Sequence, residues 1–137
     1  MKTGLLVGAA VAALLIGGPP AQAGEPIVRL ELNALEASGP RCRLSFVIEN
    51  RGETPVETLK LDLAVFGREG NIQRRLIAEM GPLRRSKTIV RTFETESSCN
   101  DIASVLVNDV AACAPAALGD CLDQLALSSR TPIRLFR

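Results

Sequence analysis

The sequence predicts an all-β fold, a seven-stranded antiparallel sandwich held together by two disulfide bonds. Apolar and polar residues alternate along several short segments, and turn-forming Gly, Pro and Asn residues separate these segments at intervals of about 10–15 residues. Alternation with a period of two puts the apolar side chains on one face of a strand, and two such faces bury each other when sheets stack. A small closed barrel is the alternative architecture.

Residues 1–23 have the pattern of a cleaved secretory signal peptide. Lys2 provides the basic start, and residues 5–17 form an apolar run of 13 residues. This run is shorter than the roughly 20 residues that span a bilayer, so an uncleaved membrane anchor is the less favoured alternative. Ala21-Gln22-Ala23 fits the small-x-small cleavage site. Cleavage there leaves residues 24–137, which we expect to form a single β-sandwich domain.

The signal also predicts where the protein works. No pair of arginines precedes the apolar run, so we expect Sec-type export rather than the twin-arginine route. The mature protein is then periplasmic or secreted, and the chain meets the membrane only through the signal peptide before cleavage.

The first three predicted strands show the alternation most clearly. They cover residues 28–34, 42–50 and 59–65, with apolar side chains at every second position. Turn residues at 38–40 and 50–55 separate them. A helix is possible for the third segment by propensity alone, but strict alternation between flanking turns favours a strand.

The next two strands are predicted at residues 72–80 and 87–94. A glycine-rich loop at 67–71 precedes the first of them as a hairpin connection, and Gly81-Pro82 turns the chain between them. One interpretation is that these two strands pair with each other across that turn.

The last part of the mature chain supplies the sixth and seventh strands. Residues 102–110 are rich in Val, Ile and Leu, which predicts a central strand, with a helix as the alternative. The seventh strand is formed either by the segment of Leu125 and Leu127 or by that of Ile133 and Leu135.

All four cysteines, Cys42, Cys99, Cys113 and Cys121, lie after the signal. An even number in an exported chain predicts two disulfides, and of the three possible pairings we favour Cys42–Cys99 with Cys113–Cys121. The second pair encloses turn-forming Pro and Gly residues that bring its ends together. The chain-entropy model gives about 4 kcal/mol for the long loop and about 2.5 kcal/mol for the short one. A four-thiolate zinc site or a catalytic dithiol lacks the CxxC spacing.

Composition argues against several classes of function. The chain has 16 basic and 15 acidic residues, which is unlike the positive excess of a dedicated nucleic-acid binder. Histidine, tryptophan and tyrosine are absent, so the chain has no histidine base, no imidazole metal ligand and no indole or phenol for stacking on sugars. We therefore expect no cofactor, no metal and no nucleic-acid partner.

Only weak candidates for catalysis remain. Glu94 with Glu96, and Asp120 with Asp123, are carboxylate pairs, but a glycosidase also needs a cleft and a sugar platform. The serine pairs at 97–98 and 128–129 have no histidine partner. The sequence therefore predicts that the protein is not an enzyme, and that these side chains are solvated loop residues.

Asp62 and Asn108-Asp109 lie within predicted apolar strands and raise the hypothesis of a calcium site. No Asp-x-Asp-x-Asp loop accompanies them. We therefore favour the interpretation that they occupy outward-facing or turn positions.

A group of basic residues surrounds the turn at Gly81-Pro82. If the strands on either side pair, these cations gather at one end or edge of a sheet. Guanidinium groups bind carboxylate or phosphate bidentately, which predicts an anionic partner or lipid headgroup surface. Protection of an edge strand against aggregation is the alternative. The candidate residues are Arg74, Arg75, Arg84, Arg85 and Lys87.

Two stretches carry a resemblance to known proteins. Residues 46–52 and 59–70 show a strand, an Asn at the turn, a second strand, a Phe and then a Gly after polar residues, and they resemble small exported bacterial domains of the immunoglobulin-like class. Most of residues 27–130 resembles a group of exported alphaproteobacterial proteins often labelled "Tat pathway signal" proteins. The matching pieces are residues 30–33, 60–63, 81–84 and 106–110 and the four cysteines.

This resemblance implies an immunoglobulin-like sandwich and brings no catalytic residues with it. The missing arginine pair departs from the group's label and bears on the export route rather than on export itself. We accordingly expect a non-catalytic interaction module whose partner is an envelope protein. The alternative is a small secreted enzyme inhibitor or stress-protective factor that inserts the Cys113–Cys121 loop into its target.

Overall fold

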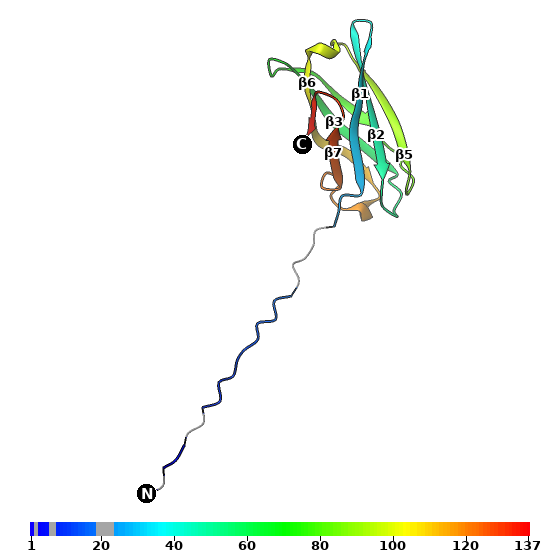
Figure 1. The fold of residues 1–137 in the computed structure, drawn as a ribbon. Coiled ribbons are helices and arrows are strands. Elements are labelled where there is room, and N and C mark those ends of the chain that lie inside the picture. The colour runs from blue at the N-terminus through cyan, green and yellow to red at the C-terminus, as the bar shows by residue number, and fades with distance from the viewer. Residues whose placement is uncertain (2, 6–7, 19–23) are drawn as a thin grey trace.

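The computed structural model describes residues 1, 3–5, 8–18 and 24–137. The predicted cleavage site at residues 21–23 and the basic Lys2 lie outside the described residues. The described residues before Gly24 are exposed, form no helix or strand, and extend away from the body of the protein (Figure 1). Within the described ranges, no helix is long and apolar enough to cross a membrane.

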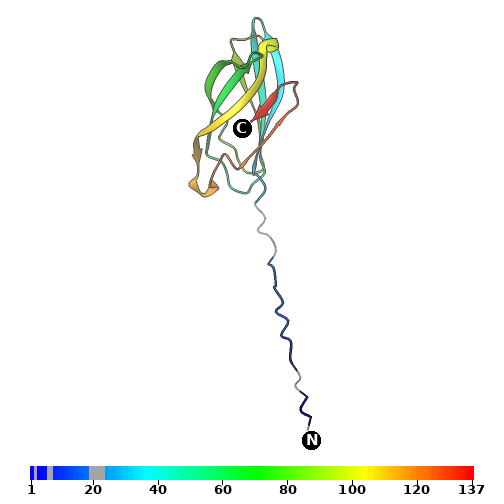
Figure 2. The same cartoon turned by 90° about the vertical axis from the view of Figure 1, so that its left-hand side faces the viewer.

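The body of the protein is all-β, as predicted, and consists of two four-stranded sheets (Figures 1 and 2). One sheet has the order β5-β2-β1-β7 and the other β4-β3-β6-β8. Two short 3₁₀ helices, η1 (Cys99–Asp101) and η2 (Ala116–Leu118), flank β6. The strands are β1 (Val28–Ser38), β2 (Arg41–Asn50), β3 (Thr58–Gly67), β4 (Ile72–Glu79), β5 (Thr88–Thr95), β6 (Ile102–Ala114), β7 (Leu125–Ser129) and β8 (Arg134–Phe136).

The number and direction of the strands differ from the prediction. Both candidate segments for the seventh strand form strands, which makes eight, and they lie in different sheets. β7 runs parallel to β1 and β8 runs parallel to β6, so the sheets are mixed rather than antiparallel. A tight turn between them carries the chain from one sheet to the other: the Ser129 hydroxyl donates to the Ile133 carbonyl at 2.7 Å and accepts the Thr131 amide at 3.1 Å.

The core lies between the two sheets, and the alternating residues of the central strands build it. β2 and β3 alternate as predicted, with their apolar side chains turned inward and buried. Phe46 of β2 packs edge-to-face on Phe93 of β5, with ring centroids 6.0 Å apart. The largest fully buried side chains are Leu30, Leu32, Phe46, Ile48, Leu59, Leu61, Leu63, Met80, Leu83 and Ile102.

The third and sixth predicted segments form strands, β3 and β6, and not the helices considered as alternatives. β3 and β6 pair antiparallel over nearly their whole length, with three register shifts. Gly70, with φ of 84°, closes the predicted hairpin between β3 and β4, where glycine has no steric cost. Gly39, with φ of 60°, does the same between β1 and β2.

The interpretation that the strands on either side of Gly81-Pro82 pair with each other is wrong. β4 is an edge strand of one sheet and β5 is an edge strand of the other. Met80 and Leu83 are fully buried, and Leu83 forms a β-bridge with Val56. This segment is therefore an apolar crossing that closes one end of the core, because burying these two side chains outweighs forming a hairpin.

The favoured disulfide pairing is confirmed. Cys42–Cys99 links β2 to η1 with a Cα–Cα distance of 4.7 Å, and Cys113–Cys121 links β6 to the segment after η2 at 6.5 Å. Both distances lie in the range that disulfides bridge. Two disulfides indicate an oxidising, extracytoplasmic compartment.

Candidate functional site

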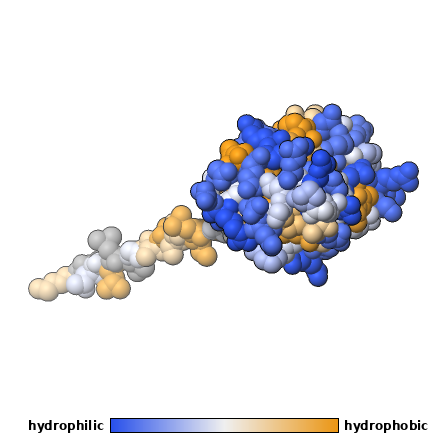
Figure 3. Space-filling view, turned by 90° about the horizontal axis from the view of Figure 1, so that it is seen from above, coloured by the Kyte–Doolittle hydropathy of each residue, from blue (hydrophilic) through white to orange (hydrophobic). Residues whose placement is uncertain are grey.

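The outer face of the β4-β3-β6-β8 sheet carries an apolar patch. β3 turns every second side chain outward, and its Phe66 lies opposite Ile72 of β4. Toward the opposite edge of the same outer face, Leu106 of β6 lies opposite Phe136 of β8. Ile72 is 55% exposed and the other three are half-buried. We call these four residues the apolar patch; elsewhere the surface seen in Figure 3 is mostly hydrophilic, with small separate apolar spots.

An open hollow of about 340 Å³ lies along this patch. Its lining includes Phe66, Arg68, Ser104, Arg134 and Phe136. The guanidinium carbon of Arg134 lies 4.2 Å from the centre of the Phe136 ring. This cation–π contact holds the charged group over the aromatic face and beside the hollow.

The two arginines of the hollow have no carboxylate partner among the residues that the structure describes. Arg68 donates to the backbone carbonyl of Asn100 instead. Glu69 and Asp101 line a neighbouring hollow with Arg68 but form no ion pair with it. A guanidinium group that has no carboxylate partner can bind the carboxylate of another protein by donating two parallel hydrogen bonds.

Next to the patch, one carboxylate oxygen of Asp62 already accepts hydrogen bonds from two side chains. Its Oδ2 accepts from Arg75 at 2.5 Å and from Asn108 at 2.8 Å. These hydrogen bonds, that of Asn108 first, lower the pKa of the Asp62 carboxyl. The side chain therefore has an outward structural role, and no group of three or more acidic, cysteine or histidine side chains in the described chain is arranged to hold a metal.

The structure does not bring the five predicted basic residues into one cluster. Arg75 lies on the outer face of β4 and is paired with Asp62, whereas Arg74 is exposed on the same edge strand. Arg84, Arg85 and Lys87 lie in the crossing between the sheets, all exposed. Arg85 pairs with Glu53 at 3.6 Å. They are apart because β4 and β5 belong to different sheets.

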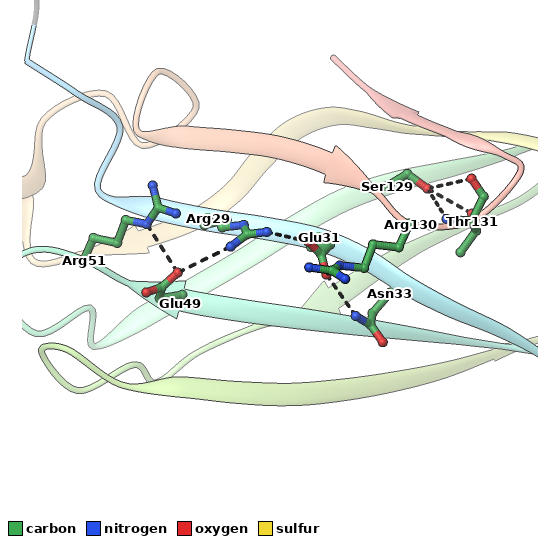
Figure 4. Close-up of polar contacts among 8 residues, drawn as sticks. All are labelled: Arg29, Glu31, Asn33, Glu49, Arg51, Ser129, Arg130 and Thr131. Atoms are coloured by element: carbon green, nitrogen blue, oxygen red, sulfur yellow. Dashed lines mark hydrogen bonds and ion pairs between the residues drawn. The ribbon is translucent and has the colours of Figure 1, made fainter.

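A second polar network covers the outer face of the other sheet (Figure 4). Its centre is Glu31 of β1, which is 5% exposed. Its carboxylate accepts hydrogen bonds from Arg29 at 2.6 Å and Asn33 at 2.9 Å, and it forms an ion pair with Arg130 at 2.9 Å. The hydrogen bond from Asn33 first, and then the charges of Arg130 and Arg29, lower the pKa of the Glu31 carboxyl against the opposing effect of burial. Every carboxylate oxygen is satisfied, so this network stabilises the fold and leaves nothing free for a substrate.

Three of the four carboxylates in the pairs considered from the sequence have structural contacts. Glu94 forms ion pairs with Arg41 at 3.8 Å and Arg43 at 3.4 Å. Asp120 caps a turn, because its Oδ1 accepts the Leu122 amide at 3.0 Å. Asp123 lies 3.9 Å from Arg137. The hydroxyl of Ser129 is used by the turn into β8, as described above.

The Cys113–Cys121 loop folds back onto the core. Leu118 is 8% exposed and lines the core beneath the loop, together with Val56, Leu59 and Leu125. The loop's exposed positions at 116, 117, 119 and 120 carry Ala, Ala, Gly and Asp. Its one large apolar side chain is therefore used inside the protein.

No family model, curated protein or solved structure matches the chain. The site is therefore defined by its own geometry. Sequence reasoning missed Arg68 and Arg134, because each stands alone rather than in a basic pair. A usable signal was present: Arg134 and Phe136 are two residues apart in a strand, which puts them on the same face.

Proposed function

We propose that the protein is a non-catalytic module that binds another exported protein through the outer face of its β4-β3-β6-β8 sheet. The observation that carries this proposal is the hollow lined by Phe66, Phe136, Arg68 and Arg134, in which Arg134 lies over the Phe136 ring and neither arginine has a carboxylate partner among the described residues. We place the module in the periplasm or outside the cell, as an immunoglobulin-like member of the exported group that the sequence resembles.

The chemistry of the hollow fits a protein segment that offers an apolar side chain next to a carboxylate. The two half-buried rings supply apolar area, and removing such area from water stabilises a complex by about 25 cal/mol per Å² before the costs of association. Arginine and aromatic residues are also the side chains that most often dominate binding energy at interfaces. Since neither arginine has an ion pair with a described residue that must break first, a partner carboxylate can accept hydrogen bonds from their remaining N–H groups.

The alternative of an inhibitor that inserts the Cys113–Cys121 loop has less support. Leu118 faces inward, and small side chains form most of the exposed tip. A loop that fills a pocket of a target enzyme needs a large side chain to bury there. We therefore centre the proposal on the sheet face.

The test is photocrosslinking in the native host envelope. A photoreactive residue replaces Ile72 in the patch, and a second strain carries it in place of the exposed Arg84, far from the hollow. We expect an envelope protein to be captured at position 72 and not at position 84. The capture should fall at least about tenfold on Arg134→Glu, the change expected from losing a charge-assisted pair and adding a like charge.

Arg84→Glu is the matched control, because it reverses the charge of an equally exposed arginine outside the patch. Capture at position 72 should survive it. The proposal is wrong if position 72 captures no partner, or if Arg134→Glu and Arg84→Glu leave capture equally unchanged.

A further inference from the structure

The two sheets end in four edge strands, and three of them are protected against pairing with another chain. β8 has 3 residues and β7 has 5, so neither offers a long row of free backbone groups. β4 has a register shift against β3 and carries the exposed Arg74 and Arg75. Short length, irregularity and charge are the usual devices that keep an edge from adding a strand.

β5 is neither short nor irregular, and its two charged residues are engaged within the chain. Its 8 residues, Thr88–Thr95, pair with β2 from Thr88 to Thr95 without a register shift. It contains no lysine and no proline, and β-branched or aromatic residues occupy most of its positions. Its other side is not paired with any described strand, and it is the outermost labelled strand of its sheet in Figure 1.

Both charged side chains of β5 already have partners within the chain. Arg91 is half-buried and donates to the carbonyl of Gly81 at 3.0 Å. Glu94 forms ion pairs with Arg41 and Arg43 of its own sheet. Val90, which directly precedes Arg91, has a side chain that is 60% exposed. The edge therefore carries an exposed apolar side chain and no charged group without a partner.

We propose that β5 pairs antiparallel with β5 of a second copy of this chain, about a two-fold axis at Thr92. The two β5-β2-β1-β7 sheets then become one continuous sheet of twice the width. This surface is separate from the apolar patch, which lies on the other sheet, so the inference does not depend on the proposed function.

The register follows from which residues would face each other. In an antiparallel pair, residues directly opposite each other point to the same face of the sheet. A two-fold axis therefore has to place one residue of β5 opposite the same residue of the second copy. An axis at Arg91 puts two guanidinium groups opposite each other, which is destabilising. An axis at Val90 pairs only the first part of the strand. An axis at Thr92 pairs residues 89–95 with their counterparts and keeps the arginines apart.

The same register gives favourable contacts on both faces. On the outer face, the hydroxyl of Thr92 lies 3.3 Å from that of Ser45, and pairing Thr92 with its counterpart extends this row of hydroxyls across the two copies. On the inner face, Arg91 lies opposite Phe93 of the second copy. The Nε of Arg91 is buried without a hydrogen-bond partner in the described chain, and an aromatic ring over the guanidinium compensates such a group. This self-complementarity favours a second copy over an unrelated peptide.

Sedimentation equilibrium of the mature protein tests the association. We expect a concentration-dependent dimer. Val90→Glu should raise its dissociation constant at least about tenfold, since in this register the new carboxylate lies opposite Glu94 of the second copy, and like charges directly opposite each other are destabilising. Ile77→Glu is the matched control, because Ile77 is 58% exposed on the edge strand of the other sheet. It should leave the dimer intact, as should Arg134→Glu, whereas Val90→Glu should not reduce crosslinking at position 72.

A cysteine pair tests the register. All four native cysteines are in disulfides, so an introduced cysteine is the one free thiol. A short bis-maleimide should join two copies of Thr92→Cys, whose side chains are about 5 Å apart in this register. It should not join Val90→Cys, because those positions lie about 13 Å apart along the strands. The proposal is overturned by a protein that stays monomeric, by a dimer that Val90→Glu leaves unchanged, or by equal crosslinking at both positions.

Discussion

The Nε of Arg130 lies 2.9 Å from Oε1 of Glu31, and this ion pair ties the end of β7 to the middle of β1. β7 is a short edge strand that pairs parallel with β1 over 5 residues. Arg29 and Asn33 bind the same carboxylate from β1 itself (Figure 4). This ion pair thus fastens β7, the last strand of this sheet in chain order, where the backbone pairing covers the fewest residues.

Glu31→Gln should destabilise the protein at neutral pH by about 1–3 kcal/mol, because a neutral amide leaves charged donors poorly satisfied. The folded pKa of Glu31 lies below its ordinary value of 4.5, so its contribution is present above about pH 4.5 and is lost as the pH falls through the folded pKa. The difference between wild type and variant should therefore shrink in acid. Urea unfolding at several pH values measures this, and Glu49→Gln, a half-exposed neighbour, should cost less. A difference that does not depend on pH would contradict the prediction.

Removing the two disulfides should have unequal effects. Replacing Cys42 and Cys99 with alanine opens a loop of 57 residues, whereas replacing Cys113 and Cys121 opens one of 8. The chain-entropy model predicts losses of about 4 and about 2.5 kcal/mol, respectively. Cys42 is also fully buried, which adds a cavity cost to the first variant. Denaturant unfolding of the two double variants should show this order, and the reverse order would refute the assignment of the long loop as the main constraint.

Phe46→Ala should lower the free energy of unfolding by about 3–5 kcal/mol, because Phe46 is 1% exposed and its ring packs against the ring of Phe93. Val90→Ala, on the outward side of β5, should change the free energy of unfolding of the monomer by only about 0.5 kcal/mol. Thermal and urea unfolding at low protein concentration, where a dimer does not contribute, compare the two. Similar costs for both would mean that the inner and outer faces are wrongly assigned.

Asn50 organises the turn that follows β2 and should be sensitive to substitution. It is fully buried, its Oδ1 accepts the Gly52 amide at 2.9 Å, and its Nδ2 donates to the Thr54 carbonyl at 3.0 Å. Asn50→Ala leaves these groups without partners and should cost at least about 2 kcal/mol. Hydrogen exchange should also accelerate at the Gly52 amide. Asn100→Ala, at an exposed position, is the control, and an equal loss there would argue against a special role of Asn50.

Local sequence pattern determined most of the strands. Period-two alternation identified the inward faces of β2 and β3, because each residue's facing depends only on its neighbours along the strand. The turn residues between Cys113 and Cys121 likewise predicted that disulfide, since closing a short loop depends on the chain within it. These features arise from interactions a few residues apart.

Only the tertiary structure decided which strands are neighbours and which side chains meet. The parallel pairing of β7 with β1 joins segments about a hundred residues apart, and the separation of β4 from β5 depends on burying Met80 and Leu83. For the same reason the predicted group around Arg74 and Lys87 is dispersed. Arg68 and Arg134, which have no ion pair with a described residue, come together because β3 and β8 flank β6 in one sheet. Local alternation predicts that a side chain faces outward. Which side chains lie next to it on that face depends on the strand order, and long-range packing selects that order.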